Sequence, residues 1–411
     1  MKRVLCVTAR FPWPLGSGQQ IATFQDLRYL AQYVQIDLVA LIDRTEVENA
    51  PQYMQALQAA IPNLTIHPPI PQPIYSNRQI TSKVAVFLRS LVTRRPFIVS
   101  KLYNQELIHA VTHLLASQPF DILYLDQLGI TYVMDFIPAQ IKSRVKVVYR
   151  IHDITAEMLY LYTKNHPWRP TNIAVMLDLI NCTAYELRIW RAVDYLLPIT
   201  TRIGRLLSEQ DQQLTAKILN FPLLIEPAHE RLTPEANGPN ILYVGSVHYP
   251  PNLAGLQWFI NTCWPVIKQT IPQAHLDIVG RGGEKLKNIT DGISIHGYVE
   301  TIEPLYQQAA VLIVPLFSGS GVRLKILEAL NRGLPVVSTR IGYAGLEINE
   351  GEHLLVADDA NGFAHHVCHL LSDRHERQRL AANGRTFVIN HHSIYATQCG
   401  VLQLIKEHRV T

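Results

Sequence analysis

Two basic residues stand where a predicted helix begins, although the positive end of a helix macrodipole favours acidic side chains. Arg323 and Lys325 occupy this first turn, and no acid precedes Glu328. The glycine-rich segment 318–321 comes directly before them. Unpaired backbone N–H groups, a glycine loop and two cations together suit a phosphate or diphosphate. An exposed helix with a surface Lys–Glu pair is the alternative, and the glycine loop after a buried strand favours the anion site.

The elements around this segment form a β–α–β unit. Apolar residues 311–314 predict a buried strand that runs into the loop, and a helix follows from about 322 to 331. Gly333 can end this helix in a left-handed cap, and 336–339 is typical of a further strand. Glu328 follows the lysine by three residues, so both side chains share one helix face, where an acid is well placed for ribose hydroxyls.

A second group of polar residues lies at the end of a predicted strand in the first half of the chain. His152 and Asp153 follow strand 145–149 and precede a helix that begins at Thr155. In open α/β sheets, ligand-binding residues gather at the carboxyl ends of strands. A His–Asp pair in this place is therefore a better candidate for ligand contact than a lone histidine, which is usually structural.

The first predicted strand, 4–7, runs into a loop that is punctuated by proline and glycine. Gly16, Ser17 and Gly18 close this loop, and a helix follows. The loop lacks the G-x-G-x-x-G fingerprint of dinucleotide-binding proteins. Its two glycines either let the backbone approach a ligand or simply make the turn, and both interpretations are equally favoured.

The composition predicts a two-domain globular protein. The 411 residues are 48% hydrophobic and 17% charged, which excludes a disordered chain. The net charge of +4 is too mild for a nucleic-acid-binding protein. Five scattered cysteines without C-x-x-C spacing predict reduced thiols, and no apolar run approaches the roughly 18 residues that span a bilayer. We therefore expect a cytoplasmic protein.

Strands and helices alternate in both halves of the chain, so each half is predicted to hold a parallel sheet with helices on its faces. The segment 221–240 carries prolines, charges and an Asn-Gly pair, and is the expected linker. It separates an N-terminal domain, 1–220, from a C-terminal domain, 241–384.

Two further segments each allow two interpretations. Residues 76–115 are more basic and helical in pattern, and either lie on the inner face of an anionic membrane or form an ordinary solvated helix.

His365, His366 and His369 share one predicted helix. Because no third ligand of clear spacing stands near them, we interpret them as surface residues, and no metal site is expected.

With these elements in place, the order of motifs resembles glycosyltransferase family 4, retaining enzymes of GT-B fold. The match is densest over about residues 241–372, where its motifs are LYVGS, LDIVGRGG, HGYV, VLIVPL, SGSGVRLKILEAL and RGLPVVST. The N-terminal half matches more loosely, through RVLCVTARFPWPLGSG and YRIHD. The resemblance implies an α/β protein with two Rossmann-like domains whose parallel sheets face across a cleft. The C-terminal domain would hold a nucleotide-sugar and the N-terminal domain the acceptor, and a final helix at about 385–411 would return to the first domain.

The same resemblance implies roles for single residues. His152 matches the histidine that lies near the transferred sugar, and Glu328 matches the second glutamate of a paired-glutamate motif, the ribose ligand. Arg323 and Lys325 would hold the diphosphate. Tyr298 and Val299 match the segment that contacts the base. The other implied donor contacts are Gly16, Ser17, Gly18, Gly245, Ser246, Gly280, Arg281, Ser318, Gly319, Ser320, Gly321 and Val322.

Two departures from the family pattern concern the sugar ring and the diphosphate. Ser320 stands where the family has the first glutamate, so backbone N–H groups would replace that carboxylate. The segment 245–252 lacks the Arg and Lys that many members carry after this strand. Arg323 and Lys325 would then supply the positive charge from the other side.

The resemblance predicts a retaining transfer of sugar from a nucleoside-diphosphate sugar to a glycan, lipid-linked or small-molecule acceptor. No Asp-x-Asp motif is evident, so fixed cations and helix dipoles would stabilise the leaving diphosphate, and neither metal nor cofactor is expected. No carboxylate nucleophile stands out, which favours front-face attack. The alternatives are a catalytically silent GT-B protein that binds a nucleotide or glycan, and a NAD-dependent dehydrogenase, which the missing fingerprint disfavours.

Overall fold

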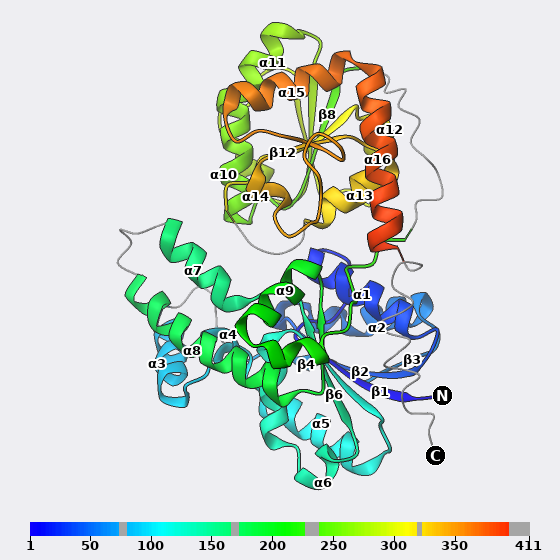
Figure 1. Ribbon diagram of the computed structural model, residues 1–411, viewed down its shortest axis with the longest axis vertical. Coiled ribbons are helices and arrows are strands. Elements are labelled where there is room, and N and C mark those ends of the chain that lie inside the picture. Colours follow the sequence, from blue (N-terminus) through cyan, green and yellow to red (C-terminus); the bar gives the residue numbers. More distant parts are fainter. Residues whose placement is uncertain (74–79, 166–171, 227–237, 319–322, 394–411) are drawn as a thin grey trace. The chain divides into compact units, whose positions relative to one another are not determined.

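The computed structural model describes residues 1–73, 80–165, 172–226, 238–318 and 323–393. The chain divides into two compact units, one from Met1 to Leu224 and one that begins at Ile225 (Figure 1). The division falls inside segment 221–240. None of the described helices is both long and apolar enough to cross a membrane.

The first unit contains a parallel sheet with the strand order β3-β2-β1-β5-β6-β7, and β4 pairs with β2. Its strands are β1 (Arg3–Thr8), β2 (Gln35–Ile42), β3 (Leu64–Ile66), β4 (Ile70–Pro71), β5 (Ile122–Asp126), β6 (Lys146–Ile151) and β7 (Tyr195–Pro198). Its helices are α1 (Gly18–Leu30), α2 (Ala50–Ala60), α3 (Ile80–Thr93), α4 (Phe97–Leu102), α5 (Gln105–Ser117), α6 (Ala139–Lys142), α7 (Thr155–Asn165), α8 (Asn172–Ala192) and α9 (Thr201–Gln210). Strand β1 lies between β2 and β5, so the chain reverses its direction of winding at β1, as in doubly wound folds.

The second unit contains a second parallel sheet, with the order β10-β9-β8-β11-β12-β13. Its strands are β8 (Asn240–Val244), β9 (His275–Val279), β10 (Ile293–Gly297), β11 (Val311–Val314), β12 (Val336–Ser338) and β13 (Leu355–Val356). Its helices are α10 (Pro250–Trp258), α11 (Trp264–Thr270), α12 (Glu303–Gln308), α13 (Leu324–Arg332), α14 (Arg340–Tyr343), α15 (Ala360–Ser372) and α16 (Arg374–His392). The prediction of two Rossmann-like α/β domains is therefore confirmed.

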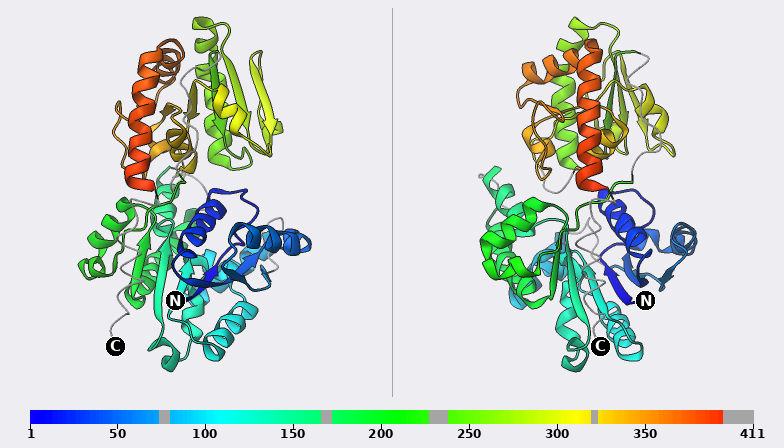
Figure 2. Two further views of the ribbon diagram at one scale, coloured as in Figure 1. Left: turned by 90° about the vertical axis from the view of Figure 1, so that its right-hand side faces the viewer. Right: turned by 45° about the vertical axis from the view of Figure 1, so that its right-hand side comes forward.

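Strand β11 shows why short apolar segments form the core of the second unit. All four of its residues are buried, as expected for a central strand of a parallel sheet with both faces covered. Val311 and Ile313 join the cluster formed with helices α11 and α15, and Leu312 points to the opposite face. Figure 2 shows the strands between the two groups of helices. Gly333 has φ +77° and caps α13, as its position predicts.

The last described helix, α16, packs on α13 of the second unit. Most of the segment expected to return to the first domain, about 385–411, is not described by the structure, so that expectation stays a prediction. A Cβ added at Gly384 would lie 2.6 Å from a methyl carbon of Leu330, which shows how closely the two helices approach. Leu380 and Phe387 on the same face are buried. Residues 394–411 lie outside the described part of the chain.

Candidate functional site

The side chain of Lys325 lies under the backbone turn that follows strand β8. Its Nζ is 4.7 Å from the ring centroid of Tyr243. A Cβ built on Gly245 would be only 2.7 Å from the same Nζ. This nitrogen is buried, and within the described residues it has no hydrogen-bond partner. A buried ammonium normally has a partner, so this group is prepared to meet an anion.

Electrostatics at Lys325 support this interpretation. Burial and the nearby charge of Arg323 together lower the pKa of Lys325 to about 7, although Glu328 acts in the opposite direction. Burial also lowers the pKa of Arg323. Two cations held this close repel each other, and a bound anion would relieve both the repulsion and the cost of burial.

The turns after β8 and β9 are packed backbone against backbone. Gly245 has φ +152° and Gly280 has φ +142°. A Cβ on Gly280 would lie 2.1 Å from the carbonyl oxygen of Gly245, so no larger residue fits. The Val247 N–H donates to the Arg281 carbonyl oxygen (2.8 Å), and Asn252 Nδ2 donates to the Ser246 carbonyl oxygen (2.8 Å). These contacts hold the glycine turns beside the lysine.

Replacing Gly280 with alanine is expected to destabilise the protein by roughly 2–4 kcal/mol, because the new methyl group must displace backbone. Chemical denaturation would measure the loss. Gly297→Ala is the matched control, since Gly297 also has positive φ but would place its Cβ in open space. Equal losses in the two variants would show that positive φ alone, rather than the close approach, requires glycine at position 280.

Other predicted donor residues lie at the same edge of this sheet. The guanidinium of Arg281 lies 5.1 Å from the ring centroid of Tyr298, which is 62% exposed. Val299 is half-buried beside it. The structure thus brings Arg281 and Tyr298 together. Of the glycine loop, Ser318 is described, whereas the predicted contacts at Gly319, Ser320, Gly321 and Val322 lie outside the described residues.

Glu328 lies one turn along α13 from the two cations. Burial raises the pKa of its carboxyl group, and the charges of Arg332 and Lys325 oppose this rise. Arg332 forms an ion pair with Glu303 (3.2 Å) and also donates to the Glu328 carbonyl oxygen. Glu328 is therefore a half-buried acid close to the lysine, in agreement with their predicted shared face.

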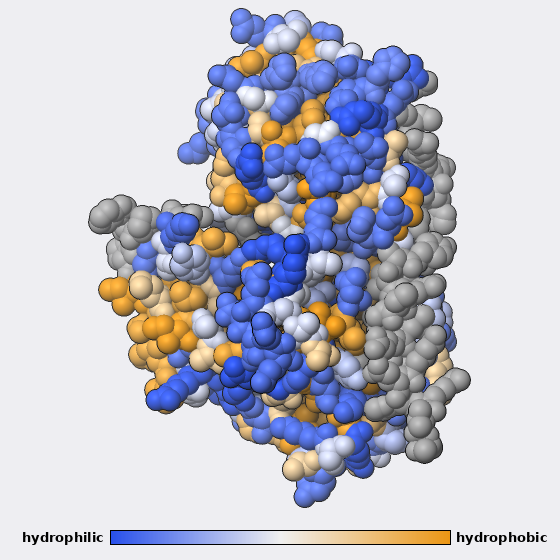
Figure 3. Space-filling view, viewed as in Figure 1, coloured by the Kyte–Doolittle hydropathy of each residue, from blue (hydrophilic) through white to orange (hydrophobic). Residues whose placement is uncertain are grey.

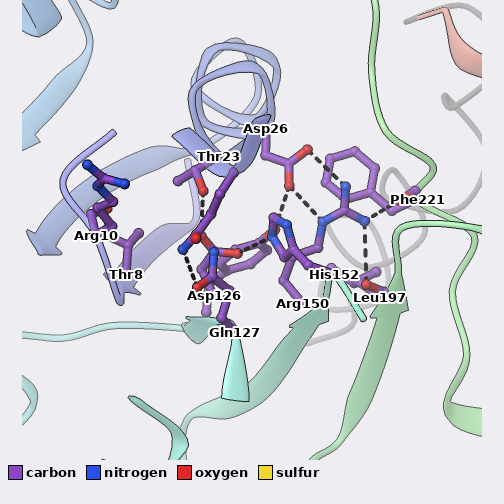
Figure 4. Close-up of polar contacts among 12 residues, drawn as sticks. Thr8, Arg10, Thr23, Asp26, Asp126, Gln127, Arg150, His152, Leu197 and Phe221 are labelled. Carbon is purple, nitrogen blue, oxygen red and sulfur yellow. Dashed lines mark hydrogen bonds and ion pairs between the residues drawn. The ribbon is translucent and has the colours of Figure 1, made fainter. Parts of the chain in front are cut away.

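In the first unit, His152 lies at the carboxyl end of the sheet in a network of buried side chains (Figure 4). His152 Nε2 and Asp126 Oδ1 are 2.6 Å apart. Thr23 Oγ1, from helix α1, donates to the other oxygen of Asp126 (2.6 Å). Strands β5 and β6 are paired neighbours, so Asp126 at the end of β5 and His152 just after β6 meet at one edge. His152 therefore lies at the strand end where the sequence placed it, and its polar neighbour there is Asp126.

A second ion pair, between Arg150 and Asp26, lies next to the pair of His152 and Asp126 (Figure 4). Arg150 donates to both oxygens of Asp26 (2.7 and 3.1 Å), and both side chains are almost fully buried. Arg150 also donates to the Phe221 carbonyl oxygen. Burial raises the pKa of Asp26, although the Arg150 charge opposes this. The pair ties α1 to β6 and so fixes the helix that carries Thr23.

The protonation of His152 depends on Asp126. Burial by itself lowers the pKa of His152, but the charge of Asp126 and its hydrogen bond outweigh burial, so that the pKa is raised above its usual value. At a given pH, the imidazolium form is therefore more populated than in an unperturbed histidine. Such a ring can donate a hydrogen bond from its other nitrogen to a ligand oxygen.

The glycine loop before α1 has a structural role that the sequence left open. Ser17 is the N-cap of α1 and accepts from the Gln20 N–H (3.3 Å). The Gly16 N–H donates to the Pro14 carbonyl oxygen (2.7 Å), which makes the turn. A Cβ on Gly18 would meet nothing within 4 Å, so crowding does not require glycine there.

Several residues of the first-unit network were missed by sequence reasoning. Asp126 is the last residue of strand β5, so the strand-end rule that selected His152 applies to it equally. Thr23 and Asp26 have no such signal, because only the fold brings α1 against β5 and β6. Asp153, the other half of the predicted pair, has a carboxyl pKa that burial raises, and its contact with Thr155 is long (3.5 Å).

The predicted histidine cluster lies on α15. The rings of His365 and His369 stack with their centroids 6.3 Å apart. Within the described ranges, no group of three or more His, Cys, Asp or Glu side chains is arranged to hold a metal ion.

Sequence comparisons find similarity to known proteins in the second unit. Residues 238–373 match the family model of the group 1 glycosyl transferases. A Klebsiella pneumoniae protein, described as an uncharacterised 44.6 kDa protein in the cps region, is 33% identical over 160 residues. This match covers 36% of the present chain and 41% of that protein, so less than half of either is compared.

Structural comparisons cover nearly the whole chain. Sucrose-phosphate synthase from Thermosynechococcus elongatus is similar with a TM-score of 0.68 and 16% identity, over 99% of both chains. HepE of Anabaena, solved with UDP-glucose, is similar with a TM-score of 0.63 and 14% identity, over 98% of both chains. Staphylococcus aureus TarM, solved with fondaparinux, α-GlcNAc-glycerol and UDP, has a TM-score of 0.68 and 12% identity, over 99% and 100%. At these identities the likeness shows the fold. The chain therefore has the GT-B fold, and residues 238–373 of its second unit are similar to the group 1 glycosyl transferases.

Proposed function

We propose that this protein is a retaining glycosyltransferase of family 4 that transfers a sugar from a nucleoside-diphosphate sugar to a glycan, lipid-linked or small-molecule acceptor. The observation that carries the proposal is the buried Lys325 ammonium beside Gly245, without a hydrogen-bond partner in the described chain and within a group 1 glycosyl transferase domain. HepE was solved with UDP-glucose and TarM with UDP, which makes UDP-sugars the first donors to test.

In the proposed reaction, the bond between the sugar anomeric carbon and the diphosphate oxygen breaks while the acceptor oxygen attacks from the same face. Lys325 and Arg323 stabilise the negative charge that develops on the leaving diphosphate. The acceptor proton passes to a leaving phosphate oxygen, so no protein nucleophile is required. Glu328 accepts hydrogen bonds from ribose hydroxyls, and His152, held by Asp126, donates to a hydroxyl of the transferred sugar.

Thermal unfolding in a panel of sugar nucleotides tests the proposal. A ligand present at 100 times its Kd stabilises the folded state by about 2.7 kcal/mol. We expect one donor class to raise Tm clearly, and NADH to leave it unchanged. The stabilising donor is then offered to acceptors in EDTA, where transfer with retained configuration should continue. No stabilisation by any sugar nucleotide would contradict the proposal.

A catalytically silent binding protein is the second candidate. It is favoured by Ser320, which stands at the position of the family's first glutamate. The two candidates differ in turnover. Release of free sugar or formation of a glycoside from the stabilising donor would exclude the silent protein, whereas tight binding with neither product would support it.

A further inference from the structure

The outer faces of helices α3 and α8 in the first unit carry exposed aliphatic side chains in regular rows. We call this set the α3/α8 patch: Val84, Leu88 and Val92 on α3, and Ile173, Met176 and Ile180 on α8. On each helix the members recur every three or four residues, so they share one face. Val92, Ile173 and Ile180 are 85%, 73% and 67% exposed. Figure 3 shows hydrophobic surface over these two helices, on the left of the lower half.

The two rows belong to one surface, because α3 and α8 pack against each other. Asn181 Nδ2, on α8, donates to the Ser90 carbonyl oxygen of α3 (3.5 Å). Val86 and Cys182, which point inward from the two helices, are buried. The buried inner faces of the two helices thus hold them to the unit. The apolar outer rows are not needed for this packing. A monomeric protein seldom exposes so many large aliphatic residues together unless the surface binds something.

The charges around the patch are positive. Three exposed basic residues lie on these helices or next to them: Lys83 on α3, Arg94 just after α3, and Lys164 on α7. The segment from 80 to 105 holds no Asp or Glu. Of the two acids on α8, Asp178 accepts from the Phe97 N–H (2.7 Å) and is buried.

The remaining acids near the patch are also engaged. Glu186, the other acid of α8, is buried and accepts from the Thr155 and Ala156 N–H groups at the start of α7 (2.8 and 3.1 Å). Glu157, the one acid of α7, pairs with Arg202. In the described part of α3, α7 and α8, every carboxylate is therefore turned inward or paired.

We propose that the α3/α8 patch docks on the surface of an anionic lipid bilayer. The aliphatic rows would enter the boundary between headgroups and acyl chains, and Lys83, Arg94 and Lys164 would lie among the lipid phosphates. A second copy of the chain is a poorer occupant, because two such faces would bring like charges together. The proposal does not depend on the reaction proposed above, since the patch contains none of the donor-site residues.

Flotation with lipid vesicles tests this docking. The full chain should float with vesicles of phosphatidylcholine and phosphatidylglycerol (3:1), and bind phosphatidylcholine vesicles about tenfold more weakly. The triple variant Val92→Gln, Ile173→Gln, Ile180→Gln should lose binding to the anionic vesicles about tenfold or more. The control variant Val266→Gln, Ile289→Gln, Ile389→Gln changes exposed aliphatic residues of the second unit and should bind as the unchanged protein does. Thermal unfolding confirms that both variants are folded.

Three results would overturn the proposal. They are equal binding by the patch variant and the unchanged protein, equal binding to the two vesicle types, and a dimer in light scattering that the patch variant converts to a monomer. Calorimetry of the same samples with the stabilising sugar nucleotide separates the two proposals. We expect unchanged nucleotide affinity in the patch variant, so loss of membrane binding and loss of donor binding are independent outcomes.

Discussion

Replacement of Lys325 by methionine is expected to weaken sugar-nucleotide binding by about a hundredfold or more, because a charge-assisted contact to the diphosphate is lost. The same change should raise the free energy of unfolding of the ligand-free protein by roughly 1–3 kcal/mol, since it removes a buried ammonium without a hydrogen-bond partner in the described chain. Calorimetry measures the first effect and chemical denaturation the second. Opposite signs in binding and stability would identify a residue retained for function.

The matched control for this variant is Lys287→Met. Lys287 is an exposed lysine of the same unit, so its replacement should change neither affinity nor stability appreciably. If Lys325→Met bound the donor as tightly as the control does, the lysine would have no contact with the diphosphate. If it destabilised the protein, the lysine would be a structural residue.

The pKa of Lys325 gives the binding a pH dependence of known sign. In the ligand-free protein this pKa is about 7, well below the ordinary value of 10.5, and a bound diphosphate would raise it. Above pH 7 the lysine must therefore take up a proton when the donor binds, and affinity should fall by up to tenfold per pH unit. Calorimetry in buffers of different ionisation enthalpy would detect this proton uptake at pH 8. In Lys325→Met the uptake should be absent.

Linkage gives a matching expectation for stability. The unfolded chain binds more protons than the folded chain between pH 7 and 10.5, so stability of the unchanged protein should rise with pH in this window. The stability advantage of Lys325→Met is then greatest below pH 7 and disappears toward pH 10.5. An advantage that is constant with pH would mean that burial of the charge is not its origin.

Replacement of Asp126 by asparagine is expected to lower turnover strongly, although Asp126 itself contacts no substrate. Among such residues of the first unit, we expect this change to have the largest effect. The carboxylate is buried, lies 2.6 Å from His152 Nε2 and raises the pKa of the ring. Without this charge, the pKa of His152 should fall and the ring should be free to turn. We expect kcat to fall roughly hundredfold. Donor affinity should change less than kcat, because the proposed contacts to the diphosphate and the ribose come from the second unit.

A spectroscopic measurement separates positioning of His152 from general damage to the fold. The His152 pKa, followed by NMR, should fall in Asp126→Asn. Because the folded-state pKa is raised, the ion pair contributes stability below the unfolded-state pKa and loses it as pH rises through the folded-state pKa. The control is Asp37→Asn, which removes an equally buried carboxylate that lies 3.1 Å from His67 in the same sheet. A control variant with the same loss of turnover would contradict a specific role for Asp126.

The strand ends of the second unit could be predicted from the sequence for a physical reason. Strands such as β11 are short buried apolar runs, and the residues after them are glycines or charges that are conspicuous against that background. The sequence therefore allowed each of three residues to be chosen as a candidate by itself: Gly245, Gly280 and Lys325. The parallel sheet brings them to one edge. The depth of the lysine was not predictable, because burial of an amphipathic side chain depends on the neighbouring turns.

The first-unit network was harder to predict because its contacts join distant segments. Thr23 and Asp126 are 103 residues apart, and Asp26 and Arg150 are 124 apart. Charged residues inside a helix such as α1 normally face solvent, and only the packing of α1 on the sheet turns Asp26 inward. The same limit applies to α8, whose outward aliphatic row has the periodicity of an ordinary buried face, and to α16, where Gly384 permits the close contact with α13.

The central claim is that the donor diphosphate binds at Lys325, Arg323 and the Gly245 turn, and a crystal structure with the stabilising sugar nucleotide tests it most directly. The claim predicts a diphosphate oxygen about 2.7–3 Å from Lys325 Nζ, with the diphosphate over the Gly245 turn and a ribose hydroxyl near Glu328. A nucleotide bound elsewhere on the chain, with Lys325 Nζ still buried and without a hydrogen-bond partner, would contradict it.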